Sequence, residues 1–134
     1  MEVLKKNADK LHQIYLIACL IAFILVCAGL FLFPRPIADN SVVTFAYADG
    51  WIREIAIWNL SMIIMIIYAL RAKNEQFNIV ITISIITISS FFAINHLVGM
   101  IIAQTLALVN LSITILNLIS AVLGIGSLIL IKLK

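Results

Sequence analysis

Long apolar runs separated by short polar segments form the pattern of this 134-residue chain. A helix needs roughly 20 apolar residues to cross a hydrocarbon core of about 30 Å, and four runs are long enough. The four runs cover approximately residues 14–33, 51–70, 77–102 and 111–131. The pattern predicts one all-α domain over residues 1–134, a polytopic membrane protein with four antiparallel transmembrane helices.

Prolines and polar residues mark the ends of these runs. The sequence PRP at 34–36 ends the first run, because proline cannot continue a helix, and the mixed segment 37–50 follows. A lipoprotein-type signal peptide cleaved before Cys19 is the competing interpretation of the first run. We expect an uncleaved span instead, because His12-Gln13 interrupts the run ahead of Cys19 and the run continues well past it.

The composition agrees with a membrane protein and excludes a soluble domain with a separate activity. Hydrophobic residues make up 64% of the chain and charged residues 11%, with a mean hydropathy of +1.20. Soluble domains are roughly 45–50% apolar and 25% charged. The net charge of +3 does not indicate a nucleic-acid partner, because the basic residues stand at the ends of apolar runs. The expected surrounding is the lipid bilayer.

The basic residues also predict the orientation of the chain. Two of them, Arg35 and Arg53, lie on one side of the expected spans, and seven lie on the other. Basic residues concentrate in cytoplasmic segments, so both termini are expected in the cytoplasm, with Tyr15 and Tyr68 near that interface. The seven cytoplasmic residues are Lys5, Lys6, Lys10, Arg71, Lys73, Lys132 and Lys134.

Polar pairs near the ends of two expected helices form the main candidate site. An Arg-Glu pair opens the second helix, and an Asn-His pair lies near the end of the third, within FFAINHLVGM. Because neighbouring helices are antiparallel, both pairs approach the outer face. We predict that they line a ligand-binding pocket in the outer leaflet. The pocket residues are Arg53, Glu54, Asn95 and His96, with Asp49 and Asn59 as additional candidates.

Two interpretations of this cluster stay open. Ionisable groups at such a depth usually face the bundle interior or a water-filled cavity, which favours a functional pocket. Alternatively, Arg53 and Glu54 extend to the headgroups while Asn95 and His96 hydrogen-bond a neighbouring helix. No metal site is predicted, because the spacing typical of paired ligands is missing, and the sequence indicates no particular cofactor.

A stripe of small residues lies on the fourth expected helix. Ser120, Gly124 and Ser127 follow one another at i, i+4 and i+7. Such a stripe lets helix backbones approach closely. It predicts either packing inside the bundle or a contact with a membrane protein partner or a second copy of the chain.

The segment 51–99 resembles small, mostly uncharacterised four-helix membrane proteins of bacteria that belong to the broad DoxX-like group. In those proteins an Arg and an acidic residue open the second helix, an Asn-Leu pair follows, a basic loop ends it, and a His closes the third helix. The resemblance implies a compact four-helix bundle in the bacterial inner membrane with its polar pocket on the outer side. The matching positions are Arg53-Glu54, Asn59-Leu60, Arg71 and Asn95-His96.

Three functions follow from these observations. The first is an accessory or binding protein of the inner membrane whose pocket takes a small polar or lipid-like ligand or a partner subunit. The second is a membrane oxidoreductase or electron-transfer component, in which His96 and Glu54 exchange protons with a quinone-like substrate. The third is a small oligomeric channel or exporter. The sequence does not decide whether the protein is an enzyme.

Overall fold

The described part of the chain is all-helical in the computed structural model. The backbone is described for residues 2–33, 48–104 and 106–133, and the side chains for residues 6–33, 52–104 and 106–133. Each of the four helices in the described residues contains a segment long and apolar enough to cross a membrane, which confirms the expected all-helical chain with four apolar helices. The helices are α1 (Glu2–Leu32), α3 (Ala48–Ala72), α4 (Glu75–Ile102) and α5 (Leu108–Lys132).

Helix α1 begins earlier than the hydropathy predicts. The expected span started near residue 14, but the helix begins at Glu2 and includes the polar head of the chain. The Leu, Lys, Ala and Gln residues of the head are good helix formers. Buried residues also recur there at helical spacing, so one face of the head packs against the bundle. These residues are Ala8, His12, Tyr15, Leu16 and Cys19.

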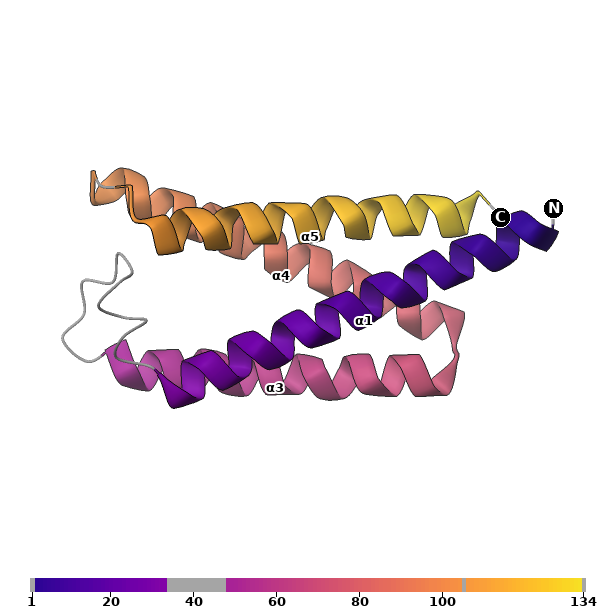
Figure 1. The fold of residues 1–134 in the computed structure, drawn as a ribbon, viewed down its shortest axis with the longest axis horizontal. Helices are drawn as coiled ribbons and strands as arrows, with labels where there is room; N and C mark the ends of the chain where they lie inside the picture. Colours follow the sequence, from indigo (N-terminus) through magenta and orange to yellow (C-terminus); the bar gives the residue numbers. More distant parts are fainter. Residues whose placement is uncertain (1, 34–47, 105, 134) are drawn as a thin grey trace.

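The four helices run alternately in opposite directions, so both termini lie at the same end of the bundle (Figure 1). We call this end the terminal end and the opposite one, where α3 begins and α4 ends, the distal end. Helix α3 packs mainly on α1, and α4 packs mainly on α5. Helix α1 also contacts α5, whereas α3 and α4 share a smaller interface.

A two-residue turn joins α3 and α4 at the terminal end. Lys73 adopts a left-handed conformation with a φ of 49°, and the Asn74 side chain accepts a hydrogen bond from the backbone nitrogen of Phe77 at 3.1 Å. The rings of Tyr68 and Phe77 pack edge to face across this turn, with centroids 5.2 Å apart. The helices are therefore held together here, and they diverge towards the distal end (Figure 1).

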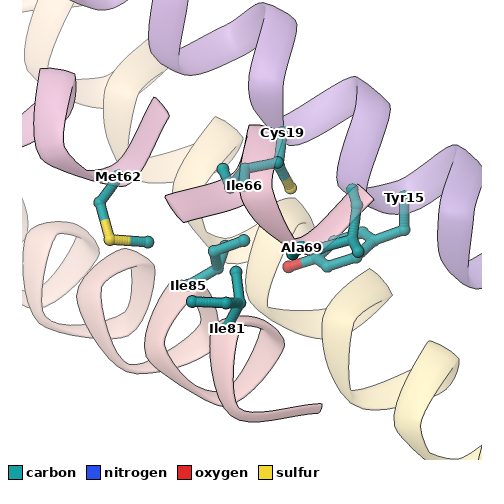
Figure 2. Packing of buried hydrophobic residues seen from close by; sticks show 8 residues of the cluster. Tyr15, Cys19, Met62, Ile66, Ala69, Ile81 and Ile85 are labelled. Atoms are coloured by element: carbon teal, nitrogen blue, oxygen red, sulfur yellow. The ribbon is translucent and has the colours of Figure 1, made fainter. Parts of the chain in front are cut away.

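The buried core joins fewer helices towards the distal end, where α3 and α4 diverge. The larger cluster joins α1, α3 and α4 around Tyr15, Met62, Ile66 and Ile85 (Figure 2). A smaller cluster of Cys27, Ala56 and Ile63 lies further towards the distal end and joins only α1 to α3. Helix α3 thus follows α1 in the distal half of the bundle while α4 follows α5.

Candidate functional site

The structure does not join the four residues of the predicted cluster to one another. Arg53, Glu54 and Asn95 are exposed, and His96 is half-buried. Within the described part of the chain, none of the four forms a hydrogen bond or an ion pair. The reason is the divergence of α3 and α4 towards the distal end (Figure 1). The role of these residues as ligand contacts stays a prediction.

The Asn95-His96 pair is divided between two faces of α4. Asn95 is exposed and follows Phe91 by one helical turn. His96 is half-buried and shares its face with Ala93 and Met100, which are both buried. This buried face packs mainly on α5. Neighbours in the sequence therefore lie in different surroundings.

The two additional candidates differ in what the structure describes. The side chain of Asp49 lies outside the described residues. Asn59 is buried in α3, and its Nδ2 donates a hydrogen bond to the carbonyl oxygen of Ile55 at 2.9 Å. Its remaining surface contributes to a cleft that the sequence did not predict.

This cleft lies between α3 and α4, with Phe23 of α1 also in its lining. Its volume is about 810 Å³, within the range of roughly 300–1,000 Å³ that is usual for small-molecule sites. Large apolar side chains form most of its surface, namely Phe23, Trp58, Met62, Met65, Phe91 and Phe92.

The polar groups of the cleft already have hydrogen-bond partners in their own helices. The hydroxyls of Ser61, Ser84 and Thr87 each donate to the carbonyl oxygen four residues earlier, at 3.3, 3.0 and 2.9 Å. Asn59 does the same with its amide. Such bonds satisfy hydroxyl groups in an apolar environment. The cleft is therefore suited to hydrocarbon and does not require a polar ligand.

The cleft opens through the side of the bundle. Trp58 and Phe91 line it and are nonetheless 76% and 67% exposed. Both lie well inside candidate membrane-spanning segments, not at the ends of the helices. A ligand would therefore enter the cleft from the side of the bundle, between α3 and α4, and not from either end of the helices.

A second group of polar residues lies inside the bundle, where α1 meets α4 and α5. His12 Nε2 and Thr82 Oγ1 are 2.7 Å apart, and both residues are buried. Ser89 Oγ donates to Ser120 Oγ at 3.4 Å. Tyr15 is buried, and its hydroxyl has no hydrogen-bond partner among the described residues. Its position near the cytoplasmic interface stays a prediction. The spacing of His12, Tyr15 and Cys19 was the available signal for this buried face.

The stripe of small residues on α5 packs inside the chain. Gly124 and Ser127 are buried, and Ser120 also lies near Cys19 of α1, at 3.9 Å between Oγ and Sγ. A Cβ atom at Gly124 would lie 2.6 Å from the Tyr15 hydroxyl oxygen and 2.7 Å from Ile86 Cγ1. The stripe thus lets α5 approach α1 and α4, and a contact with another chain through it stays a prediction.

The described residues contain no group of three or more His, Cys, Asp or Glu side chains that could hold a metal ion. Cys19 and Cys27 are buried free thiols. Comparison of the chain with protein-family models, curated proteins and solved structures finds no match. The resemblance to the DoxX-like group stays a prediction.

Proposed function

We propose that this chain is a multi-pass protein of a bacterial inner membrane that binds a membrane lipid in the cleft between α3 and α4. The four candidate membrane-spanning helices expose many Ile, Leu, Val and Phe side chains, which supports a membrane location. Soluble proteins rarely expose apolar patches larger than a few hundred Å². In a bilayer this apolar surface contacts lipid tails and is not exposed to water.

Both termini lie in the cytoplasm in this proposal. The chain ends and the α3–α4 turn share the terminal end of the bundle (Figure 1). Basic residues near that end support the assignment, because cytoplasmic segments are rich in Lys and Arg. They are Lys6, Lys10, Arg71, Lys73 and Lys132.

The depth of the cleft is the observation that carries the lipid proposal. Its lining extends on α3 from Ile55 to Met65 and on α4 from Ser84 to Phe92. At a rise of about 1.5 Å per residue these segments are roughly 12–15 Å long. This is about half of a hydrocarbon core of roughly 30 Å, which is the depth of one leaflet. On α3 the lining lies mainly in the distal half of the span Ile52–Ala72, and on α4 it lies around the middle of the span Glu75–Ile102, so the cleft is at the depth of acyl chains.

The lining favours a flexible hydrocarbon chain over a partner helix. Transmembrane helices associate through small residues that let their backbones approach. The cleft instead presents bulky side chains, including Trp58, Met62, Met65 and Phe91. Methionine is unbranched and flexible, so it adapts to a ligand of irregular shape.

A binding role is also better supported than proton exchange with a quinone. That alternative requires His96 and Glu54 within hydrogen-bond reach of each other, directly or through one water. Glu54 is exposed and makes no hydrogen bond within the described residues, and α3 and α4 diverge at that end. A lipid-binding or accessory protein needs no such contact.

Native mass spectrometry of the purified, delipidated protein in detergent tests the proposal. The wild-type chain should bind one phospholipid at concentrations where weaker annular sites are empty. Thr87→Trp places a large ring inside the cleft and should weaken this binding by about tenfold, equal to roughly 1.4 kcal/mol. The bound lipid is read directly from the mass of the complex.

Val122→Trp provides the matched control. Val122 is 66% exposed on α5 and does not line the cleft, so the same ring there should leave lipid binding unchanged. Thermal unfolding of both variants checks that they fold equally well. Equal lipid affinity in Thr87→Trp and the wild type would exclude the cleft as the lipid site.

A further inference from the structure

We infer that the lipid in the cleft carries a phosphate and a primary amine in its headgroup, as phosphatidylethanolamine does. This inference rests on the proposed function, because it assumes that the hydrocarbon chain lies between α3 and α4. It concerns the polar residues at the distal edge of the cleft. These residues do not line the cleft, so binding of a hydrocarbon chain does not explain them.

Two opposite charges lie at this edge. Arg53 and Glu54 are exposed, and neither forms a hydrogen bond or an ion pair within the described residues. Consecutive residues of a helix point about 100° apart, so the two side chains do not face each other. Each is therefore available to a group outside the chain.

Their position along α3 matches the headgroup of a lipid whose chain fills the cleft. Arg53 lies one turn before Ile57, and Glu54 lies one turn before Trp58, and both later residues line the cleft. Four residues correspond to a rise of about 6 Å towards the distal end. The charges thus stand beyond the hydrocarbon lining, with Glu54 one turn from Trp58 on the face of α3 that carries most of the lining and Arg53 one turn from Ile57 at the border of that face.

The opposite edge of the cleft carries an uncharged polar residue. Asn95 is exposed on α4, one turn beyond Phe91, which lines the cleft. Its amide can donate to the ester or phosphate oxygens of a lipid and accept from a hydroxyl or amine. The distal edge therefore offers a cation, an anion and an amide above an apolar cleft.

These groups complement a zwitterionic headgroup with N–H donors. A guanidinium binds phosphate through two parallel hydrogen bonds, which favours Arg53 as the phosphate contact. A carboxylate accepts hydrogen bonds from a primary ammonium group, which fits Glu54. The trimethylammonium group of phosphatidylcholine has no N–H to donate. Phosphatidylglycerol carries no cation, so its binding would leave Glu54 beside a second negative charge.

Competition between defined lipids tests this inference. Phosphatidylethanolamine, phosphatidylcholine and phosphatidylglycerol with identical acyl chains are added to the delipidated wild-type protein, and bound lipid is counted by native mass spectrometry. The wild type should bind phosphatidylethanolamine about tenfold more tightly than the other two, the effect expected for a charge-assisted hydrogen bond. Glu54→Gln should abolish that preference, so that the three lipids bind with about equal affinity, because the amide cannot form the ionic contact with the ammonium group.

One further variant and two controls separate the roles of the charges. Arg53→Gln should weaken all three phospholipids by about tenfold, since each contains the phosphate. Arg71→Gln and Glu75→Gln are controls at the terminal end of α3 and α4, far along the helices from the cleft, and should retain the wild-type preference. Circular dichroism confirms that all variants keep their helices.

The possible outcomes distinguish this inference from the proposed function. Tight binding of all three lipids with equal affinity, blocked by Thr87→Trp, would overturn the headgroup assignment and leave the lipid cleft in place. A preference that survives in Glu54→Gln would also overturn it. Absence of any lipid binding to the wild type would overturn both proposals.

Discussion

Gly124 shows how one residue controls the packing of this bundle. A Cβ atom there would meet the Tyr15 hydroxyl and Ile86 at 2.6 and 2.7 Å, closer than real side chains approach. Gly124→Ala should therefore destabilise the protein by about 1–3 kcal/mol, the usual cost of overpacking. Gly126 is the matched control, because a Cβ atom there meets nothing within 4 Å. Thermal unfolding in detergent, followed by circular dichroism, measures both variants.

Tyr15 gives an independent check of the same contact. Its buried hydroxyl has no hydrogen-bond partner among the described residues, and an unsatisfied group of this kind costs about 1–3 kcal/mol. Tyr15→Phe should therefore keep or raise the stability and recover part of the loss caused by Gly124→Ala. If Gly124→Ala is as stable as Gly126→Ala, the close approach of α5 to α1 is wrong.

Pairs of helices are joined by polar contacts as well as by apolar packing. The hydrogen bond between His12 and Thr82 links α1 to α4 near the terminal end. A double-mutant cycle with His12→Phe and Thr82→Val should give a coupling energy of about 0.5–1.5 kcal/mol, the range for a buried hydrogen bond. Stability measured in detergent supplies the four free energies of unfolding.

Thr87 provides the control for this cycle. Its hydroxyl bonds the carbonyl oxygen of Ile83 in its own helix, so Thr87→Val should not couple to His12→Phe. A coupling as large as that of Thr82 would mean that the cycle reports a general change of the helix. A coupling near zero for Thr82 would contradict the link between α1 and α4.

The element boundaries show where hydropathy is a sufficient guide. The predicted spans of the second, third and fourth runs extend by only a few residues in α3, α4 and α5. Helix α1 differs more, because its polar head is also helical and buries Ala8 and His12. Hydropathy averages over a window and does not detect a packed face that contains polar residues. Helical spacing of the buried positions was the missing criterion.

At the scale of the whole molecule, the common side of the two termini can be measured. Lys6→Cys and Lys132→Cys are introduced in a variant whose buried Cys19 and Cys27 are replaced by Ala. A maleimide that does not cross membranes should label neither position in intact cells, because both are expected in the cytoplasm. Gln104→Cys, exposed near the distal end of α4, should be labelled.

Permeabilised cells complete this experiment. All three cysteines should then react, which shows that the two terminal positions are accessible and not merely buried. Labelling of Lys6→Cys but not Gln104→Cys in intact cells would reverse the orientation. Opposite behaviour of the two terminal positions would contradict the prediction that the chain crosses the membrane an even number of times.

The candidate site could be predicted only in part. Arg53, Glu54 and Asn95 were selected for their polarity and depth, and each lies one helical turn from a residue that lines the cleft, while their role as ligand contacts stays a prediction. The cleft itself was missed, since residues such as Trp58 and Phe91 resemble any other lipid-facing positions in the sequence. The expected proximity of the two polar pairs assumed that the two helices stay close along their whole length. The structure shows instead that α3 and α4 diverge towards the distal end (Figure 1).

The sequence by itself determined the four long apolar helices found in the described residues, because the length and hydropathy of each run are local properties, and it predicted their alternating direction. A segment of sufficient length and hydropathy satisfies its own backbone hydrogen bonds and can cross a bilayer. Only the tertiary structure decided that α3 packs on α1, that α4 packs on α5, and that a cleft opens between α3 and α4. Lipid tails are as apolar as Leu, so hydropathy does not distinguish a packed face from a lipid-facing one. Side-chain shape makes that choice, as the fit of Tyr15 against Gly124 illustrates.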